Sequence, residues 1–288
     1  MAKTISESFS QFRRNLEITS AQLSNVSTRH NNIRNLLSKE MRIEDTFLTG
    51  SYSRSTMIAP LSDSDIDIFI VLNPMTYYLP GSKRYIFDEM LRILNNYYSE
   101  TKNISKNGEA ITICFSDFQV DVVPSFKRGG DGYHIINANT TGEIQTNPKY
   151  HAELMTEENS QHNGNLVPIV KMIKAWNRNK HYPFVSFYLE MLAIRIFKDF
   201  KIEKFSDALY YFFDNGKALI EEPLHDPVSY GGIISPYREC KSKVDALKIF
   251  TYSTFNALCA VRDEKAEIIE NSINRWRDIL GNSFPAYG

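Results

Sequence analysis

The chain has 288 residues, of which 42% are hydrophobic and 23% charged, and its formal net charge is −1. This length suits one large domain or two modest ones, and the balanced charge excludes a global attraction to nucleic acids or anionic membranes. There is no membrane-length apolar run and no signal-peptide core at the start. Three separated cysteines without a Cys-x-x-Cys pair fit a reducing compartment. We therefore expect a cytoplasmic protein with no membrane span and no structural zinc.

The first elements follow from hydrophobic periodicity. Apolar residues at spacings of three, four and seven predict one long amphipathic helix over about 5–39. A short strand is expected at 45–50, a strong one at 66–72 before Asn73-Pro74, and a helix at 82–98 with Ser82 as a candidate N-cap.

The middle of the chain predicts a hairpin, and the rest predicts helices. Segments 110–115 and 118–123 alternate like strands around a Ser116-Asp117 turn, and 127–151 is expected to be irregular with one further short hairpin. From about residue 163 the pattern is helical, with expected helices at 165–179, 184–199, 205–214, 241–262 and 263–280. The layout is α+β: a mixed first domain over 1–155 and a helical domain over 156–288.

Two aspartates stand at the start of the 66–72 strand. Because strand side chains alternate, Asp65 and Asp67 point to the same face, and two carboxylates held that close favour a divalent cation between them. A lone Asp-x-Asp is also compatible with a solvated acidic strand entrance. Asp63 shares the spacing but precedes the apolar strand, so we expect it to be an exposed loop residue.

Two further features favour the metal-binding interpretation. Gly50-Ser51 follows a strand and precedes the aspartates, where free backbone N–H groups and a hydroxyl can cradle phosphate. Asp121 lies inside the apolar run Val120-Asp121-Val122-Val123, where a carboxylate needs a partner or a metal. A neighbouring strand would bring Asp121 to the first pair, giving the three carboxylates of two-metal phosphoryl transfer.

These motifs resemble those of a known family. The string GSYSRST at 50–56, then DID at 65–67, then VDVVP at 120–124 is similar to polymerase-β-type nucleotidyltransferases, closest to the cGAS/DncV-like branch (CD-NTases), relatives of oligoadenylate synthase. The likeness continues in VPIVKMIKAWNR, SFYLEMLA, DPVS at 226–229 and the terminal WRDILGNSFP, and so covers about 45–288. The expected helix at 5–39 fits the family's spine helix by position alone.

The resemblance implies two sets of site residues. The ligands of Mg²⁺ or Mn²⁺ would be Asp65, Asp67 and Asp121. The nucleotide contacts would be Gly50, Ser51, Lys174 and Ser186, with the helical domain closing the nucleotide cleft. From the residues alone Lys174 is equally compatible with an exposed helix lysine, and Trp176 and Glu190 are interpreted as core and structural residues.

The implied activity is that of a cytoplasmic bacterial enzyme joining NTPs, ATP among them, into a cyclic di- or trinucleotide. Such a second messenger would activate an effector protein in anti-phage defence. Direct activation by nucleic acid is not supported, because nothing resembles a zinc thumb or a basic tail. An E1/E2-like partner acting on Gly288 is a further implication, since some relatives are conjugated through a small C-terminal residue.

Two alternatives use the same sequence features. A linear oligoadenylate or RNA-terminal nucleotidyltransferase would need the same three carboxylates, and a catalytically inactive nucleotide-binding module would keep the fold. The sequence leaves the bases, the ring size, the linkage and the trigger open.

Overall fold

The computed structural model describes residues 3–79, 81–101, 103–137, 143–220, 222–228, 230–239 and 242–288. The chain forms two compact units. The sheet unit comprises Ile18–Glu153 and Val228–Gly231. The helical unit comprises Met1–Glu17, Leu154–Pro227 and Gly232–Gly288.

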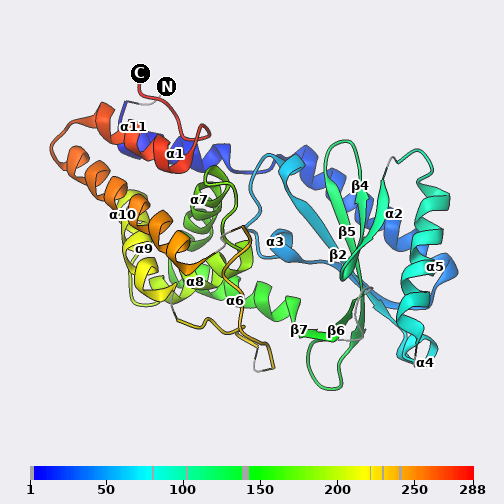
Figure 1. The fold of residues 1–288 in the computed structure, drawn as a ribbon. Helices are drawn as coiled ribbons and strands as arrows, with labels where there is room; N and C mark the ends of the chain where they lie inside the picture. Colours follow the sequence, from blue (N-terminus) through cyan, green and yellow to red (C-terminus); the bar gives the residue numbers. More distant parts are fainter. Residues whose placement is uncertain are drawn as a thin grey trace. The chain divides into compact units, whose positions relative to one another are not determined.

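The described part of the sheet unit contains a seven-stranded mixed sheet (Figure 1). Its strands are β1 (Ile43–Leu48), β2 (Asp65–Leu72), β3 (Ile104–Asn107), β4 (Ala110–Cys114), β5 (Gln119–Lys127), β6 (Tyr133–Ile136) and β7 (Glu143–Thr146). The order is β1-β2-β5-β4-β3, with β6 pairing β5 and β7. β2 and β5 run parallel, whereas the other pairs are antiparallel.

Two helices, α2 (Ser20–Glu40) and α5 (Ser82–Tyr97), cover one face of this sheet (Figure 1). Ile33 and Phe87 from these helices and Ile68 from β2 are completely buried in a common core. Each such side chain stabilises the fold by roughly 1.5–3 kcal/mol relative to exposure. Since strand residues alternate, burial of this face leaves every second residue of β2 and β5 for the opposite face.

The single helix expected over 5–39 is wrong, because the chain forms α1 (Ile5–Asn15) and then α2. Thr19 caps α2 in a capping box: its side chain accepts from the N–H of Gln22, and Gln22 accepts from the N–H of Thr19. This local signal starts a second helix, so the position expected for the spine helix is divided between α1 and α2. α1 groups with the helical unit.

Other boundaries also differ from the sequence prediction. The N-cap of α5 is Gly81 and not Ser82, whose hydroxyl instead donates to the carbonyl of Leu79 at 2.7 Å. Between the short helices α3 (Gly50–Ser53) and α4 (Pro74–Tyr77), a 3₁₀ turn spans Leu61–Asp63. β3 was not predicted, whereas the short hairpin expected within 127–151 is present as β6 and β7.

The helical unit contains α7 (Leu166–Asn179), α8 (Ser186–Phe197), α9 (Phe205–Leu219), α10 (Lys243–Lys265) and α11 (Ile269–Leu280), in addition to α1. These agree with the predicted helices to within a few residues, except that α11 begins later than predicted; residue 241 lies outside the described residues. α6 (Pro148–Gln161) was not predicted and continues from one unit into the other.

Aromatic residues dominate the core of the helical unit. Trp176 is fully buried, stacks on Phe184 with ring centroids 5.6 Å apart, and donates from Nε1 to the Ser253 hydroxyl at 2.8 Å. Phe9 of α1 contacts Trp276 of α11, so the two ends of the chain pack side by side (Figure 1). The predicted docking of Phe284-Pro285 is confirmed, since both are buried and residues 286–288 are exposed.

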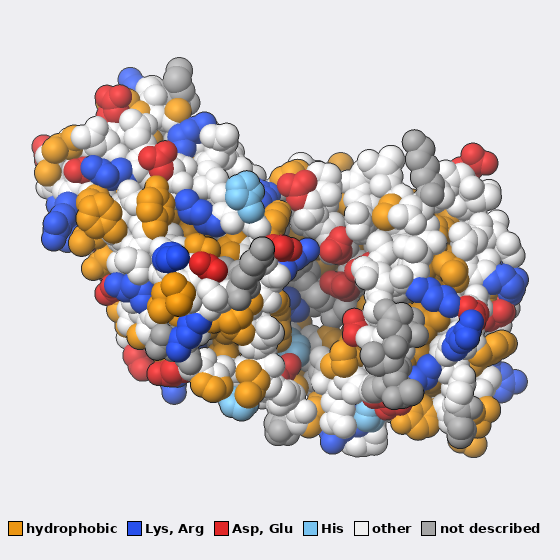
Figure 2. Space-filling model, viewed as in Figure 1, with side chains coloured by type: hydrophobic (Ala, Val, Ile, Leu, Met, Phe, Trp, Pro, Cys, Tyr) orange, Lys and Arg blue, Asp and Glu red, His pale blue; other side chains and the backbone are white. Residues whose placement is uncertain are grey.

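Not every apolar side chain is inside. Tyr252 and Phe255 of α10 are 52% and 63% exposed, and hydrophobic side chains reach the surface among Lys and Arg on this unit (Figure 2). Across the described residues, none of the helices is sufficiently long and apolar to cross a membrane.

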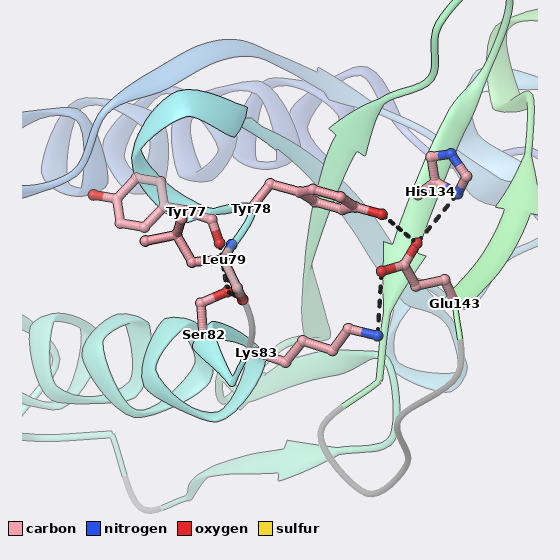
Figure 3. A network of polar contacts seen from close by, with 7 residues as sticks. All are labelled: Tyr77, Tyr78, Leu79, Ser82, Lys83, His134 and Glu143. Carbon is pink, nitrogen blue, oxygen red and sulfur yellow. Dashed lines mark hydrogen bonds and ion pairs between the residues drawn. The ribbon is translucent and has the colours of Figure 1, made fainter.

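Polar contacts fix the edges of the sheet unit. Glu143 of β7 accepts a hydrogen bond from the Tyr78 hydroxyl at 3.1 Å and pairs with Lys83 at 3.2 Å, while His134 Nδ1 lies 3.4 Å away (Figure 3). The network joins the β6–β7 hairpin to the start of α5.

The segment Val228–Gly231 belongs to the sheet unit although its chain neighbours do not. The Tyr230 hydroxyl donates to the carbonyl of Asp131 at 3.1 Å, and the Arg128 guanidinium lies 4.0 Å from the ring centroid. A Cβ at Gly132 would overlap that hydroxyl, so glycine is required there. Ser229, the last residue of the DPVS motif, lies outside the described residues.

Candidate active site

Asp65 and Asp67 lie at the start of β2, on the face opposite the helices. Along the strand, Asp65 is exposed and Asp67 partly buried, whereas the alternating Ile66 and Ile68 are 1% and 0% exposed. The side-chain period of two therefore sends both carboxylates to one face, since the isoleucines occupy the core.

The third carboxylate comes from the neighbouring strand. In the parallel pairing of β2 with β5, Asp67 stands opposite Asp121, and Asp65 stands opposite Gln119. Residues in register on adjacent strands lie about 4.8 Å apart and share a face. The strands that carry Asp67 and Asp121 are therefore neighbours, as the three-carboxylate interpretation of the sequence required.

The environment of Asp121 disfavours an isolated negative charge. Burial raises the pKa of Asp121 above its ordinary value of 3.8, a hydrogen bond from Thr112 opposes the rise, and the charge of Asp65 adds to it. The Thr112 hydroxyl of β4 donates to Asp121 Oδ1 at 2.6 Å. Thr112 was missed by sequence reasoning, although the predicted hairpin around Ser116-Asp117 already places it opposite Asp121, as the β4–β5 register does.

The donor set on this face fits a hard divalent cation, because Mg²⁺ and Mn²⁺ prefer carboxylate oxygens. Within the ranges that the structure describes, no three His, Cys, Asp or Glu side chains converge as a finished metal site. The three carboxylates fit such a cation by residue type and by their shared face of the sheet.

Gly50 and Ser51 lie directly beside this face. The N–H of Thr49 donates to the carbonyl of Asp67 at 2.9 Å, and Gly50 follows with a φ of +63°. A Cβ at Gly50 would overlap Asp67 Oδ2. Glycine is favoured here for two reasons: residues with a side chain rarely adopt this positive φ, and a Cβ would occupy the place of the Asp67 carboxylate.

The other two predicted nucleotide contacts belong to the helical unit. Lys174 of α7 is not exposed but buried, and its Nζ lies 3.1 Å from Glu190 Oε1 on α8. Ser186, the first residue of α8, is partly buried and stands one helical turn from Glu190. Trp176 lies in the core, as predicted, and Asp63 is exposed, as predicted.

A mixed sheet whose central parallel pair carries three acidic residues, with a glycine pressed against one of them, is the platform of a polymerase-β-type nucleotidyltransferase. The chain belongs to the family of the Second Messenger Oligonucleotide or Dinucleotide Synthetase domain, whose model matches residues 3–159, more than half of the 288. It is thus a CD-NTase, an enzyme that joins nucleotides into cyclic oligonucleotides.

Characterised relatives agree with this assignment. The chain is 25% identical to a cyclic AMP-AMP-AMP synthase of Acinetobacter sp. (98% of this chain, 86% of the relative). It is 22% identical to the CBASS oligonucleotide cyclase CdnC of Escherichia coli (85% and 84%).

Solved structures share the fold at lower identity. The E. coli MS115-1 CdnC in complex with HORMA-deltaN matches with a TM-score of 0.71 and 17% identity, covering 97% of this chain and 98% of that one. Vibrio cholerae DncV matches with a TM-score of 0.67 and 14% identity, covering 84% and 69%.

Proposed function

We propose that this chain is an Mg²⁺- or Mn²⁺-dependent synthase that uses NTPs, ATP among them, to make a cyclic di- or trinucleotide. The observation that carries the proposal is the parallel register of Asp67 with Asp121, with Asp65 two residues away on the same face. Three carboxylates arranged in this way suit phosphoryl transfer, and the family membership supplies the reaction class.

Each residue then has a separate role. Asp65 and Asp67, beside the Gly50-Ser51 turn, bind the cation that accompanies the triphosphate, while Asp121 completes the site of the attacking hydroxyl. When bound, the cations stabilise the charge of the leaving pyrophosphate and help the hydroxyl to lose its proton. The close approach of Gly50 to Asp67 lets backbone N–H groups reach a phosphate that the same carboxylate's cation holds.

The helical unit supplies the remaining contacts. Lys174 binds the phosphates of the donor nucleotide as a point charge, and Ser186 adds a hydroxyl. Lys174 pairs with Glu190, which lies one helical turn after Ser186 on α8, and this arrangement supports a common task. Both residues belong to the helical unit, whereas the carboxylates belong to the sheet unit.

The relatives suggest the product and its context. Similarity to a cyclic AMP-AMP-AMP synthase makes cyclic triadenylate the first product to seek, and similarity to CBASS cyclases suggests a downstream effector in anti-phage defence. The reaction is placed in the cytoplasm, where NTPs are available. The solved CdnC–HORMA complex favours testing a regulatory protein partner, and the exposed Gly288 is accessible to an E1/E2-like enzyme.

The product assay tests this proposal. Purified protein is incubated with labelled NTPs and Mg²⁺ or Mn²⁺, with and without RNA, and the products are treated with phosphatase and weighed by mass spectrometry. A cyclic product resists phosphatase because it has no terminal phosphate, and EDTA should abolish its formation. A phosphatase-sensitive ladder would support the linear polymerase instead, and no turnover with any NTP mixture would favour an inactive module.

A further inference from the structure

Two lysines of α7 offer an internal comparison. Lys171 and Lys174 are one helical turn apart, and each is 7% exposed. Lys171 Nζ lies 2.6 Å from Glu17, whose side chain is 47% exposed, whereas Lys174 Nζ lies 3.1 Å from Glu190, whose side chain is completely buried. In the Lys171–Glu17 pair the carboxylate side chain is the more exposed partner, whereas in the Lys174–Glu190 pair only the lysine side chain has any exposure.

Stability does not explain the buried pair. Removing a carboxylate and an ammonium from water costs more than their attraction commonly returns, and a well-packed apolar pair is often as stable or more so. The surrounding helices are rich in apolar residues, since Leu189, Met191 and Leu192 flank Glu190 and are at most 4% exposed. An ion pair in such a place therefore suits a need for charge at a fixed point.

We propose that Glu190 is a positioning residue, which keeps the Lys174 ammonium charged and oriented toward the triphosphate of the donor nucleotide. This inference rests on the proposed function, since it deepens the role given there to Lys174. A buried amine needs an anionic neighbour to remain an ammonium, and Glu190 is that neighbour. Of the pair, only the Lys174 side chain keeps solvent exposure, so an anion from solvent can approach the lysine but not the carboxylate.

Loss of Glu190 has two opposing effects on phosphate binding. It removes a negative charge that repels phosphate, but it also lets Lys174 lose its proton and its fixed rotamer. The second effect should dominate, because the attraction comes from the ammonium in contact with the phosphate while Glu190 acts from behind it. Ser186, one turn from Glu190 on α8, would be oriented by the same pair.

The test measures binding of αβ-methylene-ATP with Mg²⁺ by calorimetry, so that its readout is separate from turnover. We expect Lys174→Met to weaken binding about 10-fold or more, and Glu190→Gln to weaken it about 3–10-fold. In the Lys174→Met background, Glu190→Gln should add less than about 2-fold, because the two residues act as one unit. Glu17→Gln, the matched change at the Lys171 pair, should leave the affinity unchanged.

Melting temperatures separate positioning from a purely structural role. Partial unfolding lowers the fraction of binding-competent protein but not the affinity of the folded fraction. If Glu190→Gln does not fold, Glu190→Asp keeps the charge and withdraws it by one methylene, and in a folded protein it should weaken binding measurably but less than the roughly 3–10-fold expected for the loss of the charge. Unchanged affinity in a folded Glu190 variant, or equal weakening with and without Lys174, overturns the inference. A wild type that binds the analogue but makes no cyclic product would overturn the proposed function alone.

Discussion

The acidic face of the sheet unit and helix α7 of the helical unit differ in how their charged side chains are paired. On β2 and β5 like charges stand side by side, and the charge of Asp65 contributes to the raised pKa of Asp121. In the helical unit opposite charges stand side by side on α7, where Lys171 pairs with Glu17 of the segment after α1 and Lys174 pairs with Glu190 of α8. The acidic face carries like charges that raise the pKa of Asp121, whereas these two lysines of the helical unit already have anionic partners and the unit is built around an aromatic core.

The largest effect should come from that core. Trp176→Ala removes a fully buried ring that contacts Phe184, Phe213 and Phe250, and should lower the free energy of unfolding by about 3–5 kcal/mol. Denaturant titration measures the change. Phe255→Ala is the control, because this ring is 63% exposed and should cost less than about 0.5 kcal/mol. Similar losses at both positions would contradict the core described for this unit.

The next largest effect concerns the reaction itself. Asp121→Asn should bind NTP with Mg²⁺ at near wild-type affinity yet turn over about 10²-fold more slowly, a barrier increase of about 3 kcal/mol. The reason is that its carboxylate is needed where the hydroxyl loses a proton, which occurs in the transition state. Changing Asp65 and Asp67 together to Asn should abolish both metal-dependent binding and turnover. Calorimetry beside product assays measures both quantities.

Asp63→Asn is the matched control for these variants, since Asp63 is exposed in the turn before β2. It should change neither binding nor turnover. If Asp63→Asn were inactive while Asp67→Asn stayed active, the metal ligands would be Asp63 and Asp65 in place of Asp65 and Asp67. Full activity in Asp121→Asn would mean that Asp121 is not part of the site.

The acidic face could be predicted from the sequence because its signal is local. Asp65 and Asp67 interrupt an apolar strand with a period of two, and Asp121 does the same in a second strand. The parallel pairing of these strands could not be read from the sequence, since two helices and two further strands separate them in the chain. The close approach of Gly50 to Asp67 comes instead from the antiparallel pairing of β1 with β2, which places Leu48 opposite Ile68.

The helical unit shows where sequence reasoning fails. Lys174 has the pattern of either a surface or a site lysine, and its burial follows from a glutamate on the next helix that periodicity assigns to the core. The break before α2 and the start of α6 had readable signals in Thr19-x-x-Gln22 and in Asn147-Pro148, where Asn147 accepts from the N–H of Tyr150. The first signal was overlooked because hydrophobic periodicity continues across the break before α2. The second was overlooked because the periodicity of α6 is weak.

A smaller effect is expected at the glycine beside the acidic face. Gly50→Ala adds a methyl group that overlaps Asp67 Oδ2 at a φ of +63°, so it should cost about 1–2 kcal/mol of stability and displace the carboxylate. Activity should fall more than the folded fraction does, which product assays normalised to folded protein would show. Gly129→Ala, where a Cβ meets nothing within 4 Å, is the control and should be neutral. Equal activity in the two variants would mean that the approach of Gly50 to Asp67 has no role in the reaction.

The smallest expected effect is a gain in stability, whereas most substitutions lower the stability of a protein. Because burial and Asp65 raise the pKa of Asp121, the folded metal-free protein holds its proton more tightly than the unfolded chain does. Stability is therefore lost as the pH rises from 3.8 through the folded pKa of this group, and the loss is complete above it.

Asp121→Asn keeps an oxygen for the Thr112 hydroxyl but carries no charge, so in EDTA at neutral pH it should be more stable than the wild type by about 0.5–2 kcal/mol. The advantage should vanish below pH 3.8, where both side chains are neutral. It should shrink at neutral pH on addition of Mg²⁺, which stabilises the protein with all three carboxylates more than the variant that keeps two. Asp63→Asn should show none of this dependence. An Asp121→Asn protein that is less stable than the wild type in EDTA at neutral pH would show that like charges on this face carry no cost, and the contrast between the two units would be lost.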